Sequence, residues 1–485
     1  MRYRLFIVPL LAASLASAQE TPEATALRVA EAYKMGRAML APSAMELRAK
    51  DNIEIDTLGQ GHVRFQQFRG GVPVFEGETI VHVDLAAQTV VDETDATLQV
   101  GAVDLVPRIH ANHARDIALT RLRVGGRVRS TLSLAVVMIG ENPHLAWRVR
   151  VEGSEGREAV DRIVFVDALS GGVLLAWDNL QSVAAAGTGR SLFNGQVALT
   201  TDQAGVFTDA DATWGGFAPT DPATAGVDAQ YGAAVAWDYF KNVHGRNGIA
   251  NNGAGARNRV HYSTRYNNAF WSDSCFCMSY GDGDGITFNP FASIDVAGHG
   301  MTHGVTSRTS NLTYLGESGG LNEATSDIFG TMVEFYAANP DDPADYLIGE
   351  RLYKSGARAL RSMIKPSSDG VSADCWYSSV RDLDVHYSSG VANHFFHLLA
   401  EGTSQGSRTC VTGNTQTATG AATLVGIGRS DAERIWYRAV TVYMTPSTNY
   451  AAARVATLKA ATDLFGATST QYASVAAAWT AVLVK

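Results

Sequence analysis

The sequence predicts an α+β protein in which a mixed N-terminal module precedes a larger region with a strand-rich first half and a helical second half. Alternating polar and apolar residues indicate strands between residues 62 and 178, whereas apolar residues at helical spacing dominate from residue 294 onward. The 485 residues suffice for more than one domain, and 46% hydrophobic residues exclude wholesale disorder. The net charge of -9 gives no broad basic surface and argues against nucleic acid as a partner.

The first 18 residues have the pattern of a secretory signal peptide. Arg2 and Arg4 precede an apolar run over residues 5–15, and the small residues at 16–18 match the site at which such peptides are cut. The run is shorter than the ~20 apolar residues that a membrane span needs, and no later stretch approaches that length. We therefore expect a secreted protein with no membrane anchor after cleavage, in which disulfide bonds can form.

The module at residues 19–184 is predicted to be α+β. Apolar residues at helical spacing indicate helices over residues 21–48 and 111–123. Alternation indicates hairpin strands at residues 62–68, 72–84, 146–153 and 161–178, the last with a turn at Ser170-Gly171-Gly172. This part of the sequence contains no nucleophile, metal-ligand cluster or phosphate loop. Small and polar residues at 182–191 then resemble an exposed linker and a processing site.

Two lobes are expected after this linker. Residues 185–295 are rich in Gly, Asn, Asp and Thr and are predicted to form turns and short strands. Residues 296–485 are predicted to be mainly helical, with helices over residues 294–308, 321–339, 390–401, 431–444 and 450–465. A cleft between two such lobes is a natural substrate site.

Four cysteines, Cys275, Cys277, Cys375 and Cys410, allow three pairings. We expect Cys275–Cys277 and Cys375–Cys410, although a bridge between cysteines two residues apart requires a tight turn. A zinc site built from these cysteines is disfavoured, because closed all-cysteine sites usually use C-x-x-C pairs.

His299 and His303 are four residues apart on a predicted helix, which places both imidazoles on one face for a shared zinc ion. By itself this spacing more often marks two surface histidines without a metal. Glu323, on the next predicted helix, is a candidate third ligand, and three protein ligands with an open fourth position define a catalytic zinc site. Asp327, one turn further, is a candidate acceptor for the outer N–H of a ligand histidine.

From about residue 187 to the C-terminus, the sequence resembles the thermolysin family of secreted zinc metalloendopeptidases. The resemblance rests on the segments at 268–271, 280–285 and 384–390 and on the histidine pair with Glu323. It implies a strand-rich lobe and a helical lobe around a cleft, peptide or protein substrates, and a monomer after maturation. The implied zinc ligands are His299, His303 and Glu323, with Asp327 and Asn322 behind them.

The resemblance also implies catalytic and substrate-binding roles. Tyr314 and His386 stabilise the tetrahedral intermediate, Asp384 orients His386, and Arg361 binds the substrate carbonyl. The edge-strand segment that pairs with the substrate backbone consists of Asn268, Ala269, Phe270 and Trp271. The pocket for the residue after the scissile bond is lined by Val296, Leu352 and Leu360. Such apolar walls favour large aliphatic or aromatic side chains.

Calcium sites are implied by carboxylates around the central helices. The matching residues are Asp295, Glu334, Asp345 and Glu350. Hard oxygen ligands at flexible spacing suit calcium, and we expect one or two structural ions beside the single zinc ion. Solvated surface carboxylates are the alternative.

The segment at residues 61–74 resembles the fungalysin/thermolysin-type propeptide, and the strands near 146–178 resemble its small second module. The resemblance implies that residues 19–184 assist folding, inhibit the enzyme and are then removed. A permanent binding domain is the alternative.

The sequence departs from the family pattern H-E-x-x-H at Gly300. In the family this glutamate takes a proton from the attacking water and passes it to the leaving nitrogen. A positioned acid–base group contributes ~10²- to 10⁴-fold, so we expect strongly reduced activity. Three explanations stay open: a changed copy of an active peptidase, a pseudopeptidase that binds zinc and peptides, and an enzyme with weak residual activity. Because Tyr314, Arg361, Asp384 and His386 are all present, we favour the first.

Overall fold

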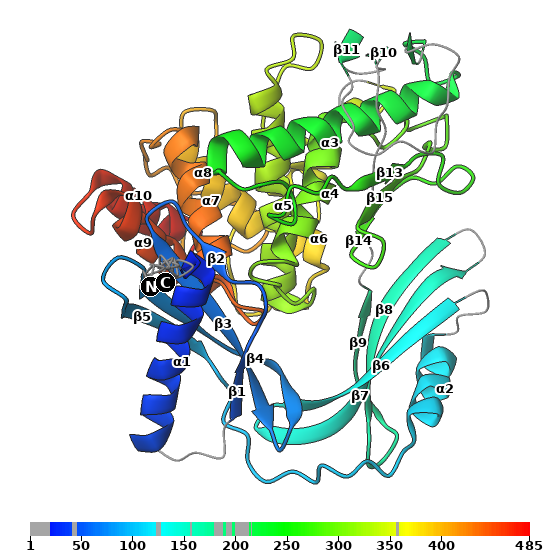
Figure 1. The fold of residues 1–485 in the computed structure, drawn as a ribbon. Coiled ribbons are helices and arrows are strands. Elements are labelled where there is room, and N and C mark those ends of the chain that lie inside the picture. The colour runs from blue at the N-terminus through cyan, green and yellow to red at the C-terminus, as the bar shows by residue number, and fades with distance from the viewer. Residues whose placement is uncertain are drawn as a thin grey trace, which may run out of the picture.

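The structure, a computed structural model, describes residues 20–40, 46–122, 128–155, 158–178, 188–190, 196–198, 213–214, 216–355 and 358–485. The expected signal peptide at residues 1–18 and the expected boundary at residue 184 lie outside these ranges. Within them, no helix has both the length and the apolar character needed to cross a membrane. Figure 1 shows a β-rich N-terminal module, in blue to cyan, beneath a mainly helical body in green to red.

A nine-stranded sheet is the framework of the N-terminal module. Its order is β1-β3-β4-β6-β7-β8-β9, with β2 beside β3 and β5 beside β4. The strands are β1 (Glu46–Ala49), β2 (Glu54–Ile55), β3 (Gln60–Arg69), β4 (Val72–Asp84), β5 (Thr89–Ala96), β6 (Val128–Ile139), β7 (Asn142–Glu155), β8 (Glu158–Asp167) and β9 (Val173–Asp178). A parallel bridge between Val74 and Val136 joins the first five strands to the last four.

One helix packs on each half of this sheet. Helix α1 (Pro22–Leu40) packs through buried Ala26, and α2 (Ala111–Leu122) packs through buried Ala118. This arrangement confirms the predicted α+β module. Strands β1, β2, β5 and β6 were not predicted from the sequence; β5, for example, is largely polar and lies at the edge of the sheet, where alternation is weak.

The first lobe combines short strands with one long helix. Its strands form two small sheets, β11-β10-β12 and β13-β15-β14, built from β10 (Thr188–Arg190), β11 (Gln196–Ala198), β12 (Thr213–Trp214), β13 (Arg257–Arg259), β14 (Ala269–Ser272) and β15 (Cys277–Tyr280). The prediction of turns and short strands omitted helix α3 (Pro222–His244) and was wrong there. Asp221 caps this helix by accepting from Ala223 N, Pro222 begins it, and its many alanines favour helix.

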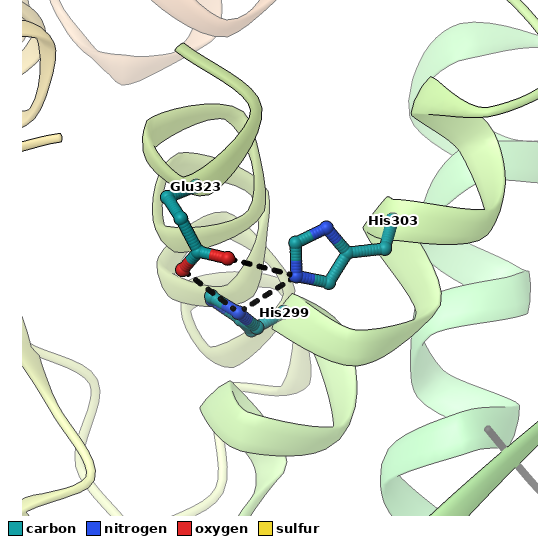
Figure 2. Close-up of side chains that lie close together, drawn as sticks. All are labelled: His299, His303 and Glu323. Carbon is teal, nitrogen blue, oxygen red and sulfur yellow. Dashed lines mark hydrogen bonds and ion pairs between the residues drawn. The ribbon is translucent and has the colours of Figure 1, made fainter. Parts of the chain in front are cut away.

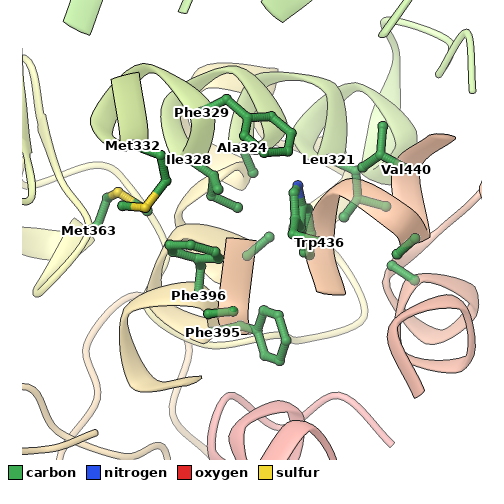
Figure 3. Close-up of a cluster of buried hydrophobic side chains, with 14 of the residues drawn as sticks. Leu321, Ala324, Ile328, Phe329, Met332, Met363, Phe395, Phe396, Trp436 and Val440 are labelled. Atoms are coloured by element: carbon green, nitrogen blue, oxygen red, sulfur yellow. The ribbon is translucent and has the colours of Figure 1, made fainter. Parts of the chain in front are cut away.

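The second lobe is helical, as expected. Its helices are α4 (Ile294–Thr306), α5 (Gly316–Ala337), α6 (Val385–Ser388), α7 (Gly390–Glu401), α8 (Arg429–Arg438), the π-helical η4 (Ala439–Tyr443), α9 (Tyr450–Phe465) and α10 (Thr470–Ala481). Short elements between α5 and α6 are β16 (Leu347–Ile348), η1 (Glu350–Leu352), β17 (Arg361–Ser362), η2 (Pro366–Asp369) and η3 (Val380–Asp382). Figure 3 shows its core, where Ile328 of α5, Phe395 of α7 and Trp436 of α8 gather.

Helices α4 and α5 pack with their backbones close together. A Cβ on Gly330 of α5 would lie 2.6 Å from the carbonyl oxygen of Asp295 and 3.0 Å from the backbone nitrogen of His299. Gly298 of α4 lies at the same contact, because a Cβ added to it would be 3.1 Å from Gly330 Cα. Two glycines therefore let the helices approach each other closely, and this approach brings residues of α5 to the histidines of α4.

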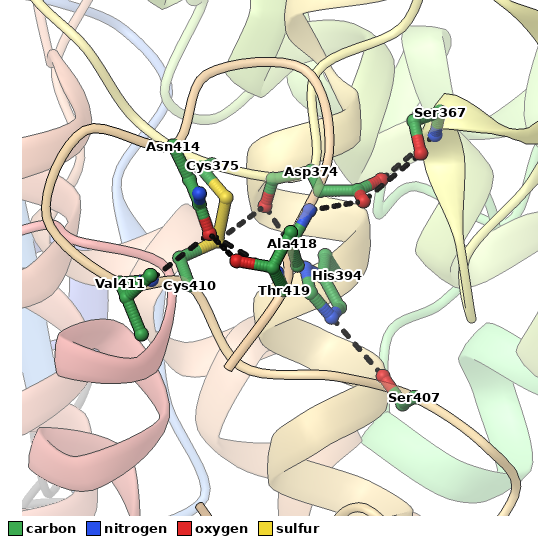
Figure 4. The surroundings of a disulfide bond; sticks show 10 residues. All are labelled: Ser367, Asp374, Cys375, His394, Ser407, Cys410, Val411, Asn414, Ala418 and Thr419. Carbon is green, nitrogen blue, oxygen red and sulfur yellow. Dashed lines mark hydrogen bonds between the residues drawn. A yellow bond between two sulfur atoms is a disulfide. The ribbon is translucent and has the colours of Figure 1, made fainter. Parts of the chain in front are cut away.

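Both expected disulfides are present, and the structure contains no other pairing. Cys275–Cys277 spans a tight turn in which Cys275 N donates to Ser272 O at 3.3 Å. Figure 4 shows Cys375–Cys410, which tethers the loop after α7 to the body of the lobe. Beside it, the carboxylate of Asp374 accepts from Ser367 Oγ and from the backbone nitrogen of Ala418, at 3.0 and 2.8 Å.

Candidate metal centre and active site

Two helices bring the three expected zinc ligands to one point. Figure 2 shows His299 and His303 on α4 with their rings turned toward the carboxylate of Glu323 on α5. His299 Nε2 lies 3.1 Å from His303 Nε2 and 3.5 Å from Glu323 Oε2, and His303 Nε2 lies 3.3 Å from Glu323 Oε1. Tetrahedral zinc with ligands at ~2.1 Å separates them by ~3.4 Å, so this arrangement fits the ion.

The environment of Glu323 also suits a cation. Its Oε2 atom is buried and has no hydrogen-bond partner among the described residues. Burial alone would raise the pKa of Glu323, but the charges of His386, His299 and His303 hold that pKa well below its ordinary value. A buried ionised carboxylate is stable only when paired, and a metal ion would supply the pairing.

The outer nitrogens of both histidines are fixed by hydrogen bonds. His299 Nδ1 donates to Asp327 Oδ1 at 2.9 Å, and His303 Nδ1 donates to Asn322 Oδ1 at 2.8 Å. These bonds leave the Nε2 lone pairs facing the site. Burial lowers the pKa of His299, which favours the neutral ring that a metal requires. The structure thus places Asp327 and Asn322 where they were expected.

Asp327 connects the candidate metal centre to Arg361, the residue expected to bind the substrate carbonyl. Arg361 donates to it through Nε at 2.8 Å and through Nη2 at 2.6 Å, and Asn393 Nδ2 donates at 2.8 Å. Burial would raise the pKa of Asp327, but Arg361 and His299 hold it well below its ordinary value. Asn393 was not predicted from the sequence, because a polar residue on the buried face of α7 belongs to no recognisable motif.

The other expected catalytic residues lie on the open side of Glu323. Tyr314 Oη donates to Glu323 Oε1 and lies 3.3 Å from His386 Nε2, and His386 Nδ1 donates to Asp384 Oδ1 at 2.8 Å. Burial and the Glu323 charge raise the pKa of Tyr314 well above its ordinary value, so the phenol stays a donor. Desolvation lowers the pKa of His386, but Glu323 and Asp384 outweigh it and raise the pKa.

Position 300 has no room for a side chain while Met278 keeps its present rotamer. A Cβ on Gly300 would lie 1.8 Å from Met278 Sδ and 2.2 Å from its Cε. Met278 on β15 is 1% exposed and belongs to the main hydrophobic core. The thioether therefore fills the space in which a side chain at residue 300 would begin, a contact that the sequence did not reveal.

The apolar residues expected to line a specificity pocket gather in one cluster. Val296, Leu352 and Leu360 pack together with Ala269, and the phenyl rings of Phe288 and Phe291 complete the cluster. These two rings were not predicted from the sequence. A cavity of about 1070 Å³ lies beside the cluster and is lined by Leu360 and Arg361 among other residues.

Strand β14 lies at the edge of its three-stranded sheet, as expected for the segment at 268–271. Asn268 is exposed and Ala269 is half-buried, whereas Phe270 and Trp271 are buried. Phe270 packs against Tyr262, and Trp271 lies in the core with its Nε1 donating to Asp273. Any substrate contact from Phe270 or Trp271 would therefore come from the backbone.

A second group of carboxylates forms a buried cluster between α5 and the segment that follows it. Glu334, Asp342 and Glu350 bring one oxygen each within 4.8 Å of one another. Burial is the largest cause that raises their pKa values, the charge of Asp295 is the next, and the pKa values rise to about 11, 7 and 9 respectively. Asp295 and Asp345 lie close enough for the Asp295 charge to raise the pKa of Asp345, but they are outside the closest group. Asp342 was missed, although it sits in an acidic run with Asp341.

Three segments of the chain match models of known protein families. Residues 181–307 match the thermolysin metallopeptidase catalytic domain, residues 310–484 match its alpha-helical domain, and residues 46–89 match the fungalysin/thermolysin propeptide motif. Thermolysin of Alicyclobacillus acidocaldarius subsp. acidocaldarius is 34% identical over 526 residues, which cover 97% of this chain and 91% of that protein. The chain belongs to the thermolysin family. It is a metalloprotease precursor with its propeptide motif in strands β1 to β4.

Other thermolysin-family proteins are also similar. A transglutaminase-activating metalloprotease of Streptomyces mobaraensis is 43% identical over 472 residues, and the present chain spans 61% of its length. A solved structure of the precursor of protealysin from Serratia proteamaculans is 29% identical, with a TM-score of 0.45, and the match covers 63% of this chain and 88% of that chain.

Proposed function

We propose that the chain is the secreted precursor of a zinc endopeptidase whose activity is strongly reduced because Gly300 replaces the general base. The convergence of His299, His303 and Glu323 on one point carries the proposal. When bound there, zinc supplies Lewis acidity and lowers the pKa of water to ~7. We further propose cleavage before large hydrophobic residues, since the cluster around Leu352 is apolar.

The surrounding residues can perform the remaining steps of peptide hydrolysis. Tyr314 remains a hydrogen-bond donor, and His386 is held by Asp384 with its Nε2 directed toward Glu323. Both can donate to an oxygen that gains negative charge during attack on the peptide carbonyl. Arg361 faces the cavity beside the apolar cluster, in a position to bind a substrate carbonyl while Asp327 holds it.

Proton transfer is the function that this chain lacks at residue 300. Glycine has no acidic or basic group, and the two carboxylates that contact the histidines, Glu323 and Asp327, are already committed to the metal centre and to Arg361. We therefore propose a rate lower by ~10²- to 10⁴-fold or more than that of a form with a base. Glycine in a helix interior also costs ~1 kcal/mol relative to alanine.

Restoring the carboxylate tests the proposal, and an isosteric amide is the matched control. Gly300→Glu and Gly300→Gln require the same displacement of Met278, whose Sδ and Cε lie at the mobile end of its side chain. Only glutamate can accept a proton. With zinc present, Gly300→Glu should remove its own propeptide and hydrolyse casein, whereas Gly300→Gln and the present form should do neither at a comparable rate.

The second candidate is a zinc-dependent peptide-binding protein without catalysis. The filling of the space at residue 300 by Met278 favours it, because the core is complete without a glutamate there. A Gly300→Glu form that binds zinc and peptide but stays inert would establish this alternative. A Gly300 form that already cleaves at the rate of Gly300→Glu would contradict both candidates.

We propose that residues 19–184 are the inhibitory propeptide and folding aid, residues 185–295 and 296–485 are the two catalytic lobes, and the mature protein is a secreted monomer. The propeptide motif at residues 46–89 supports the first part, and the matches to a catalytic domain at 181–307 and an alpha-helical domain at 310–484 support two lobes after it. We also propose one or two structural calcium ions, held by Glu334, Asp342 and Glu350 with Asp295 and Asp345 nearby.

A further inference from the structure

The propeptide module is joined to the helical lobe by ion pairs. Asp56, just after β2, pairs with Arg438 of α8 at 2.5 Å, and Asp92 of β5 pairs with Lys459 of α9 at 2.6 Å. Figure 1 shows the blue strands of the module beside the orange and red helices of this lobe. Protonation events near these pairs can therefore affect how firmly the two parts are held together.

Two buried histidines lie at this junction and contact each other. His62 of β3 and His82 of β4 face each other in the strand register, and each is 1% exposed. Their Nδ1 atoms are 2.9 Å apart. His62 Nε2 lies 3.0 Å from Asp56 Oδ2, and His82 Nε2 lies 3.0 Å from Thr94 Oγ1.

This chain of hydrogen bonds limits how many protons the pair can carry. With both rings neutral, Thr94 donates to His82 Nε2, His82 Nδ1 donates to His62 Nδ1, and His62 Nε2 donates to Asp56. With one added proton the Nδ1–Nδ1 hydrogen bond can persist, because one of the two facing Nδ1 atoms still has no hydrogen. A second proton places N–H groups on both facing Nδ1 atoms, so the contact breaks.

The surrounding charges oppose protonation of His82. Burial is the largest cause, and His62 with the cations Lys459 on α9, Arg64 on β3 and Arg438 on α8 adds to it, so the pKa of His82 lies well below the ordinary imidazole value. The opposing carboxylates are already paired, because Asp56 and Asp463 share Arg438 and Asp92 is bound to Lys459. Glu78, the neighbouring acid on β4, is bound by Arg64 and Lys50.

His82 also contacts the helical lobe directly. Its ring lies 5.2 Å from the ring of Tyr443 in η4, and the Tyr443 hydroxyl donates to Asp463 of α9. A cavity of about 490 Å³ between the sheet and α9 is lined by His82, Tyr443 and Lys459, among others. A positive charge on the His82 ring would lie near Lys459, and repulsion between the two cations would weaken this contact between the module and the helical lobe.

We propose that the facing pair His62 and His82 is a pH-sensitive latch that holds the propeptide on the helical lobe at neutral pH and releases it when the second proton binds. The proposal rests on the proposed function in that residues 19–184 are taken to be the removable propeptide. At pH values above the ordinary histidine pKa, the neutral pair stabilises the junction. Because the pKa of His82 is lowered in the closed state, stabilisation is lost as the pH falls below that ordinary value.

Hydrogen–deuterium exchange of the full chain in its Gly300 form tests the latch without any need for activity. Protection factors, corrected for the intrinsic exchange rate, are compared between pH 7.5 and 5 in peptides that cover β3, β4 and the η4–α9 segment. We expect local opening at the junction to increase by up to about tenfold per pH unit below the switch, the slope of one-proton linkage. Protection of the α5 core should change less.

Replacement of either histidine should remove this dependence. His82→Gln and His62→Gln keep hydrogen-bonding groups but cannot take up the second proton, and one serves if the other fails to fold at pH 7.5. His394→Gln is the matched control, because His394 is equally buried but lies on α7, bonded to Asp374 O and Ser407 Oγ. Any effect of acid on the zinc ligands is the same in the unaltered chain and in the three variants, so it does not affect the comparison between them.

Two results would overturn the latch. The first is protection at the junction of the unaltered chain that does not change between pH 7.5 and 5. The second is a pH dependence of that protection that is as steep in both His82→Gln and His62→Gln as in the unaltered chain. These results are independent of the restoration experiment at residue 300. An inert Gly300→Glu form would contradict the proposed function and leave the exchange data unaffected, whereas a flat exchange profile would contradict only the latch.

Discussion

Asp327 accepts a hydrogen bond from His299 Nδ1 at 2.9 Å with the same carboxylate that binds the guanidinium of Arg361. The candidate metal ligand His299 and Arg361 thus share one buried anion. We expect Asp327→Ala to weaken zinc binding by ~10- to 100-fold, because the His299 ring loses the partner that fixes its tautomer. Competition with a chromogenic chelator measures the zinc affinity. Glu31→Gln, at an exposed carboxylate on α1, should leave the affinity unchanged; an equal loss in both would contradict the assignment.

The close contact between α4 and α5 predicts that alanine destabilises the protein at a glycine within the contact but not at an exposed helical glycine elsewhere. Gly330→Ala adds a Cβ that would lie 2.6 Å from Asp295 O, so we expect ~1–3 kcal/mol of destabilisation and weaker zinc binding. Gly36→Ala on α1 meets nothing within 4 Å and should stabilise by ~0.5–1 kcal/mol. Urea unfolding monitored by circular dichroism gives both values. Similar behaviour of the two variants would show that the close helix contact is not required.

The buried carboxylates predict a pH-dependent response to calcium. The pKa values of about 11 for Glu334 and about 9 for Glu350 lie above those of an unfolded chain, so folding favours their protonated forms. Without calcium, stability should fall as the pH rises above ~4.5, and calcium should restore it most at high pH. Melting temperatures between pH 5 and 8, with zinc constant and with either calcium or a calcium-selective chelator, check this. Glu334→Gln should abolish the calcium effect; a melting temperature indifferent to calcium at pH 8 would exclude the site.

The apolar cluster around Leu352 predicts the specificity of a Gly300→Glu form. Peptide libraries should be cut before Leu, Phe, Ile or Val, because the cluster that contains Val296 and Leu360 has apolar walls. Mass spectrometry of the products identifies the residue after each cut. A preference for Asp, Glu, Lys or Arg at that position would refute the pocket assignment.

The contacts between the N-terminal module and the helical lobe predict that replacement of one buried arginine strongly reduces the stability of the module. Arg64 is bound to Glu78 and donates to the carbonyls of Thr441 and Met444. Arg64→Ala removes these bonds and leaves Glu78, 2% exposed, with Lys50 as its remaining partner. We expect a loss of ~3–5 kcal/mol in the stability of the module, seen as faster proteolysis at strands β3 and β4. Arg48→Ala, at an exposed arginine of β1, should have little effect.

Much of the site could be predicted because its residues come from short motifs. The i, i+4 spacing of His299 and His303 requires only that the segment be helical, and helix α4 confirms it. Helix α3 was not predicted, because glycine and aspartate within residues 222–244 obscured its alanine-rich pattern. Asn393, Phe288 and Phe291 were not predicted either, since each gains its place only when distant segments pack together.

The sequence alone predicts the two-part α+β organisation, the disulfide pairing that the structure confirms and three candidate metal ligands, and it shows directly that residue 300 carries no carboxylate. These features depend on local periodicity, on motif spacing and on residue identity. Only the tertiary structure decided that Met278 fills the space at Gly300, that Asp342 joins Glu334 and Glu350, and that His62 meets His82. Each of these contacts joins residues on different elements, and close packing across the chain, which no local pattern records, brings them together.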